Sequence, residues 1–204
     1  MNERFYRLPK EKQQLIINAG FQVFSQNSYK KSPVAQIAAT AGISKSLLFH
    51  YFHNKKELYL FLWKKSAEIT MDYLEKYHCY EPKDFFEMME RGMEAKLQVM
   101  KEYPYMFSFA VKAFYEKEEC LRTEIRKIYQ DCFEQKTAES LKKLNPEDFI
   151  HGLDLEMMMR EIYWTSEGYL WEMVQKGQLD SVQMKKDFGR LISFWKFVYT
   201  GRKS

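Results

Sequence analysis

The chain has 204 residues, 46% of them hydrophobic and 17% aromatic, which is enough for a core in one or two domains. Only 8 glycines and 5 prolines occur, without sustained alternation of Val, Ile or Thr, so an all-α fold is expected and a mainly β fold is excluded. No apolar run approaches the ~20 residues of a membrane span, and the start lacks a signal-peptide core, so we expect a cytoplasmic protein without a membrane partner. The first predicted element is a helix over residues 9–27.

Residues 32–52 predict two short helices joined by a tight turn. Ser32 is expected to be the N-cap of the first, with Pro33 at the first helical position. Gly42 should end that helix, because glycine adopts the left-handed conformation without steric cost. Ser44 should cap the second helix. This is the layout of a helix-turn-helix, whose second helix can lie in a DNA major groove.

The second of these helices has two different faces. Leu48 and Phe52, four residues apart, are expected to anchor it to the core. The opposite face presents Lys45, Ser46, Phe49 and His50. An ordinary helical corner in an all-α protein is the alternative reading of this segment.

The charge of the chain is unevenly distributed. Residues 1–65 hold eleven Lys or Arg and three Asp or Glu, so this third carries +8, whereas the whole chain carries +4. Residues 66–204 therefore carry −4. A basic N-terminal third is typical of a local site for a polyanion such as nucleic acid.

A new helix is predicted to start after the second helix of this segment. Asn54 is expected to be its N-cap, and Glu57 three residues later gives a capping-box pattern. Lys55 and Lys56 would be unfavourable at a helix N-terminus unless an anion lies nearby. DNA phosphate would supply that anion.

This region resembles the DNA-binding part of TetR-type (tetracycline-repressor-like) transcriptional regulators, over roughly residues 8–65. The residues that match the family pattern are Ile37, Ala38, Ala41, Gly42, Ser44, Lys45, Leu48, Tyr51, Phe52, Lys55 and Leu58. Three residues depart from it: Pro33, Leu47 and Phe49. The loss of a tyrosine hydroxyl at Phe49 removes one expected phosphate contact, and Leu47 could read a thymine methyl group.

The resemblance implies a homodimer that binds a near-palindromic double-stranded DNA operator. Two recognition helices would enter successive major grooves roughly 34–36 Å apart. The expected base contacts come from Lys45, Leu47 and His50, beside Phe49. The expected backbone contacts come from Ser32, Ser44, Ser46, Tyr51, Lys55 and Lys56.

The rest of the chain predicts further helices, about nine in all. They are expected over residues 55–78, 83–102, a short aromatic stretch after 105, 119–144, 154–176 and 180–200. We expect a DNA-binding domain at 1–54 and a larger ligand-binding and dimerisation domain at 55–204. By resemblance, helix 55–78 links the two and transmits regulation.

The second domain is rich in methionine, since all of the 12 methionines except Met1 lie beyond residue 70. Thioether and aromatic side chains adapt to apolar ligands, although each Met could simply fill the core. The pocket is expected to be lined by Trp63, Met93, Phe107, Phe114, Met158, Tyr163 and Trp164. Its ligand would be an unidentified small apolar effector.

The final predicted helix is apolar on more than one side, which requires two packing partners. Burial within one chain is one reading, and a two-fold helical interface, favoured by the resemblance, is the other. The stripe assigned to this dimer interface is Met184, Phe188, Leu191, Trp195 and Val198.

No catalytic residue, cofactor or metal site is expected. The histidines are scattered, the three cysteines lack metal-ligand spacing, and no catalytic motif is present. The expectation is therefore a ligand-responsive transcriptional regulator, most simply a repressor, and not an enzyme. Two alternatives stay open: a DNA-binding dimer without an effector, and a small-molecule binder or enzyme that keeps the helix-turn-helix as scaffold.

Overall fold

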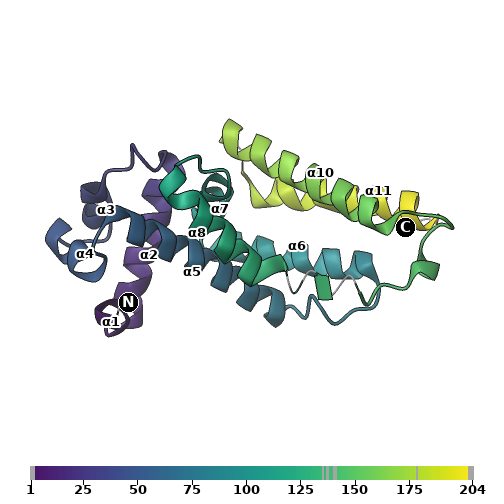
Figure 1. Ribbon diagram of the computed structural model, residues 1–204, viewed down its shortest axis with the longest axis horizontal. Helices are drawn as coiled ribbons and strands as arrows, with labels where there is room; N and C mark the ends of the chain where they lie inside the picture. Colours follow the sequence, from purple (N-terminus) through teal and green to yellow (C-terminus); the bar gives the residue numbers. More distant parts are fainter. Residues whose placement is uncertain (1–2, 135, 137, 140–141, 178, 202–204) are drawn as a thin grey trace. The chain divides into compact units, whose positions relative to one another are not determined.

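The computed structural model describes residues 3–134, 136, 138–139, 142–177 and 179–201, which form helices and the loops between them, with no strand among them. The α-helices are α1 Glu3–Tyr6, α2 Lys10–Gln26, α3 Val34–Thr40, α4 Lys45–Tyr51, α5 Lys55–Lys76, α6 Phe85–Glu102, α7 Met106–Phe114, α8 Glu119–Tyr129, α10 Leu155–Lys176 and α11 Ser181–Thr200 (Figure 1). The all-α prediction is thus confirmed. None of the helices in the described part combines the length and apolar character needed to cross a membrane.

Two details of the helices differ from expectation. The short helix α1 was not predicted. The helix expected over 119–144 is α-helical to Tyr129, forms a π-helical turn over Gln130–Glu134, and is again α-helical at residues 136 and 138–139. Residues 135, 137 and 140–141 of that expected helix lie outside the described residues.

The chain divides into two compact units. Unit 1 comprises Met1–Ile69 and Tyr103–Cys132, and unit 2 comprises Thr70–Glu102 and Phe133–Ser204. Packing therefore groups α7 and α8 with the N-terminal helices, and α5 contributes to both units. The functional division expected at residue 54 stays a prediction.

Buried side chains of the helix-turn-helix anchor it to the core of unit 1. Leu48 and Phe52 are completely buried, as their spacing predicted. Phe5 of α1 packs on Phe52 and Phe61 with ring centroids 5.3 and 5.0 Å apart. Such aromatic contacts add to the stabilisation from burial. The unpredicted helix α1 thus holds α4 in place.

Local capping at the turn and at α5 agrees with the sequence. The Leu47 N–H donates to Ser44 Oγ at 3.1 Å, and Gly42 has φ +68°. The Glu57 N–H donates to Asn54 Oδ1 at 2.9 Å, while the Glu57 carboxylate accepts the N–H of His53 at 3.2 Å. These bonds satisfy helix-terminal donors that would otherwise lack partners.

The prediction for Ser32 is wrong. Pro33, not Ser32, is the N-cap of α3, and no side chain caps this helix. The Ser32 hydroxyl donates backwards to the Ser28 carbonyl at 2.9 Å, and the residue is only 2% exposed. Because this hydroxyl is buried and already bonded, Ser32 is no longer a candidate for contact with DNA phosphate.

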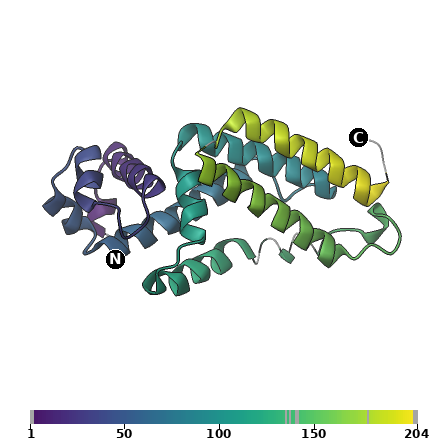
Figure 2. The same cartoon turned by 90° about the horizontal axis from the view of Figure 1, so that it is seen from above.

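Unit 2 is built on α6, α10 and α11. The helices α10 and α11 run side by side in both views, and α11 also packs on α6 (Figures 1 and 2). Its main core cluster includes Phe86, Met158, Ile162, Ile192 and Trp195. Asp180 caps α11 by accepting the Gln183 N–H at 2.8 Å.

Candidate DNA-binding surface and ligand pockets

The outer face of α4 is polar and accessible. Lys45, Ser46 and His50 are exposed, and Leu47 keeps 37% of its surface. Phe49 and Tyr51 are half-buried, and Lys45 Nζ lies 5.8 Å from the centroid of the Phe49 ring. Helix α4 therefore presents these side chains while Leu48 holds it from the opposite side.

Arg4 is an additional residue at this surface that the sequence analysis missed. Its Nη1 lies 3.2 Å from His50 Nδ1 and 3.3 Å from Nε2, from a position 46 residues earlier in the chain. Both residues are exposed. The only sequence signal was the basic character of the N-terminus. The contact places a permanent positive charge beside His50.

Lys55 and Lys56, predicted to contact the DNA backbone, both have partners within the chain. Lys55 Nζ donates to the Lys30 carbonyl at 3.0 Å and lies 4.9 Å from the Tyr29 ring centroid, and burial lowers the Lys55 pKa. Lys56 Nζ pairs with Glu124 of α8 at 2.7 Å. Lys55 thus links the start of α5 to the loop before α3, and the Glu124 carboxylate compensates the charge of Lys56.

The residues predicted to line one apolar pocket are not gathered in either unit. Trp63, Phe107 and Phe114 belong to unit 1, whereas Met93, Met158, Tyr163 and Trp164 belong to unit 2. Buried Trp63 donates its indole N–H to the Ile125 carbonyl at 3.1 Å, and Met158 packs in the core. Trp164 is 58% exposed, so it faces outward. Phe114 lines a pocket on α7 and α8, and none of the seven lines the cavity beside Phe85 and Phe86.

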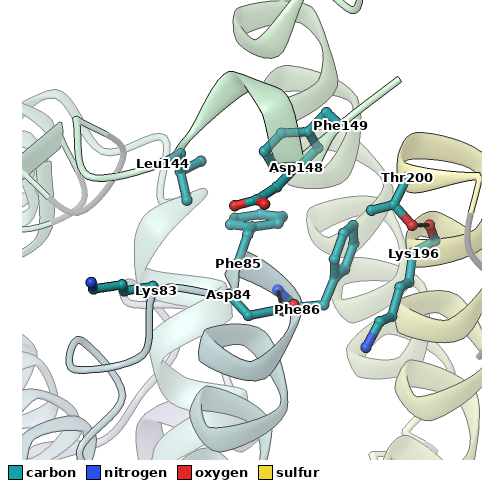
Figure 3. A pocket seen from close by; sticks show the side chains of 9 residues that line it. All are labelled: Lys83, Asp84, Phe85, Phe86, Leu144, Asp148, Phe149, Lys196 and Thr200. Atoms are coloured by element: carbon teal, nitrogen blue, oxygen red, sulfur yellow. Dashed lines mark hydrogen bonds between the residues drawn. The ribbon is translucent and has the colours of Figure 1, made fainter. Parts of the chain in front are cut away.

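Each unit has a pocket of its own. In unit 2, a cavity of about 20 Å³ lies among Phe85, Phe86, Asp148 and Phe149, with Lys83 and Lys196 at its edge (Figure 3). Such a cavity holds about one water molecule. In unit 1, a pocket of about 290 Å³ lies at the C-terminal end of α7 and on α8, lined by Phe114, Tyr115, Glu116, Lys117, Arg122, Ile125 and Arg126. Only the second approaches the size of a small-molecule site.

The stripe predicted as a dimer interface on α11 is largely the inner face of the helix. Met184 and Trp195 are 3% and 1% exposed, so they are buried within the chain. Leu191 is half-buried against the unit 2 core, and half-buried Phe188 packs on Tyr169 with centroids 5.1 Å apart. Only Val198 of the five is exposed. The assignment failed because both faces of α11 are apolar.

A different set of apolar residues is exposed on α10 and α11. We call these residues the outer patch: Met157, Tyr163, Trp164, Trp171, Phe194, Phe197 and Val198. Met157, Trp164 and Trp171 follow each other at intervals of seven residues, which places them along one side of α10. Exposed aromatic side chains in this number mark an interaction surface.

The arrangement of α3, the Gly42 turn and α4 defines a helix-turn-helix protein, a class that reads DNA through its second helix. A family model described as "Bacterial regulatory proteins, tetR family" matches residues 16–61, the same segment. Over these residues the chain is similar to the DNA-binding part of TetR-family regulators.

One curated relative is the HTH-type transcriptional regulator RutR of Escherichia coli (strain K12), which is 29% identical over 100 residues. The match covers 48% of this chain and 45% of RutR, so the chain spans about half the length of the curated relatives that it matches.

Two solved structures share the whole fold. A TetR family transcriptional regulator from Chloroflexus aurantiacus J-10-FL has a TM-score of 0.64 and 21% identity, with 95% of each chain covered. The transcriptional regulator FadR from Bacillus subtilis, in complex with stearoyl-CoA, has a TM-score of 0.66 and 20% identity, with 88% of this chain and 96% of FadR covered. At such identities the likeness concerns the fold.

Proposed function

We propose that this protein is a dimeric transcriptional regulator, a repressor that binds a near-palindromic operator and leaves it when a small-molecule effector binds. The observation that carries the proposal is α4 itself. Ser44 caps this helix, completely buried Leu48 anchors it, and Lys45 and His50 stand on its exposed face. A capped, anchored helix with an accessible polar face is what major-groove reading requires.

The expected division of work on DNA follows from the exposure of each side chain. Lys45, Leu47 and His50 are positioned to meet base edges, with Arg4 beside His50. Tyr51, Ser46 and exposed Lys31 are candidates for backbone contacts. The Ser44 hydroxyl already accepts the Leu47 N–H, so its main contribution is to shape the helix.

The dimer is assigned to the outer patch on α10 and α11. Its aromatic side chains remain exposed in the single chain, and aromatic residues dominate the energetics of protein interfaces. The effector part rests on the 290 Å³ pocket of unit 1 and on the FadR structure of similar fold, which holds stearoyl-CoA.

The test is binding of the purified protein to DNA upstream of its own gene, followed by fluorescence anisotropy against a scrambled competitor at two salt concentrations. Regulation predicts binding that survives the competitor and the higher salt. Binding that equals the competitor and collapses with salt would reflect counterion release alone and would contradict the proposal.

Two substitutions separate base reading from backbone contact. His50→Ala should change which base pairs are preferred, with about 1–3 kcal/mol of discrimination lost at one position. Lys31→Ala should weaken binding to all sequences about equally and lower the salt slope by about 1. If both variants lost affinity uniformly, the role of His50 in base reading would be wrong.

A further inference from the structure

The pocket of unit 1 combines apolar walls with an excess of positive charge. Its apolar lining consists of Phe114, Tyr115 and Ile125, and its cationic lining of Lys117, Arg122 and Arg126. The Phe114 ring packs against Tyr115 and Tyr129 with centroids 5.2 and 5.0 Å apart, so this wall is held in place. Its volume of about 290 Å³ corresponds to a molecule of modest size.

The positive charge in the lining is only partly compensated. The one carboxylate of the lining, Glu116, accepts the backbone N–H groups of Lys117 and Glu118 at 2.8 and 3.2 Å. Arg122 faces Glu119 at 3.5 Å, in a contact where the Glu119 side chain is 89% exposed. For Lys117 and Arg126, the described part of the chain contains no ion pair. The pocket is therefore lined by three cationic side chains and one carboxylate, which already accepts two backbone hydrogen bonds.

We propose that this pocket binds a small organic anion, a carboxylate or phosphate ester attached to a flat apolar body. The guanidinium groups of Arg122 and Arg126 would hold the anionic group, since their planar forks suit carboxylate and phosphate oxygens. The apolar body would lie against Phe114, Tyr115 and Ile125. A ligand therefore needs both an anionic group and an apolar body. An uncharged ring would leave the cations without an anion, and a small inorganic anion would leave the apolar walls uncovered.

Helix α8 and its N-cap residue Glu118 connect this pocket with the DNA-binding region. Glu118 pairs with Lys30 at 2.8 Å, and Glu124 pairs with Lys56 at 2.7 Å. The Ile125 carbonyl, in the pocket wall, accepts the Trp63 indole N–H from α5. An anion that draws Arg122 and Arg126 inward would move α8 and with it these three contacts. This coupling rests on the proposed function, whereas the anion site does not.

The test uses the full chain without DNA and phenyl phosphate as the probe, with benzyl alcohol and inorganic phosphate as comparisons. Isothermal titration and thermal unfolding measure binding. We expect saturable binding of phenyl phosphate with a raised melting temperature. Benzyl alcohol and inorganic phosphate should each bind at least about tenfold more weakly, because each lacks one half of the ligand.

The matched variants are Arg122→Gln with Arg126→Gln, and Lys127→Gln as control. Lys127 is an exposed cation of the same helix that does not line the pocket. The double variant should bind phenyl phosphate at least about tenfold more weakly, and the control should bind it like the wild type. Circular dichroism confirms that both variants are folded.

Three results would overturn the proposal: no saturable binding by the wild type, equal losses in the double variant and the control, or equal binding of phenyl and inorganic phosphate. Because these measurements contain no operator, failure of the anion site leaves operator binding untouched, and the reverse also holds.

Discussion

The outer face of α4 and the outer patch of α10 and α11 are both accessible, but they expose opposite chemistry. Helix α4 exposes Lys45, Ser46 and His50, whereas Trp164, Phe194 and Phe197 are 58%, 59% and 51% exposed. Cationic groups gain free energy when they displace the counterions condensed on a polyanion. Exposed aromatic surface gains free energy only when another apolar surface covers it. This difference supports the proposal that the first face binds DNA and that the other binds a second copy of the chain.

The largest effect is expected when the outer patch is made charged. Phe194→Asp with Phe197→Asp should raise the dimer dissociation constant by at least about a thousandfold, because two buried aromatic contacts are lost and two carboxylates are desolvated. Sedimentation velocity measures the change. Leu15→Asp, at a residue of unit 1 that is 57% exposed, is the control and should leave the dimer intact. Equal behaviour of both variants would remove the outer patch as the interface.

The next effect compares two neighbouring leucines of α4. Leu48→Ala should lower the free energy of unfolding by about 2–5 kcal/mol, since its side chain is completely buried. Leu47→Ala should change stability by no more than about 0.5 kcal/mol and act on DNA affinity instead. Urea unfolding measures the first quantity and anisotropy the second. If Leu47→Ala and Leu48→Ala lowered the free energy of unfolding by similar amounts, α4 would have no solvent-accessible face that could contact DNA.

The smallest effect concerns the ion pair between α5 and α8. Glu124→Gln removes the partner of Lys56 and should raise DNA affinity by about two- to tenfold, with a salt slope steeper by about 1, because Lys56 can then reach phosphate. Glu172→Gln, which removes the partner of Lys176 on α10, is the control. Unchanged affinity and slope for Glu124→Gln would show that Lys56 has no part in DNA binding.

Most of the predictions that succeeded depend on residues within four positions of one another. Ser44 caps α4, Gly42 adopts a left-handed conformation, and Asn54 caps α5. Each of these depends on a bond or backbone angle that the neighbouring sequence dictates. The family pattern was recognisable for the same reason, because its spacing is local.

The predictions that failed concern which surface a side chain faces. The proposed pocket lining drew residues from two separate units, since methionine and aromatic content does not tell a core from a cavity. Ser32 turned inward because the Ser28 carbonyl lay within reach. Lys56 pairs with Glu124, 68 residues away, a contact that no local pattern reveals; the part of Lys56 in DNA binding stays a prediction.

By itself, the sequence determined the all-α class, the helix-turn-helix and its caps, because periodicity and capping act over a few residues. Only the tertiary structure decided that Trp195 of α11 lies inside while Phe194 lies outside. Both are large and apolar, so their hydrophobicity favours burial equally, and the packing of α11 on α6 and α10 selects between them. In unit 1, the turn between α7 and α8 likewise decides that Lys117, Arg122 and Arg126 line one pocket.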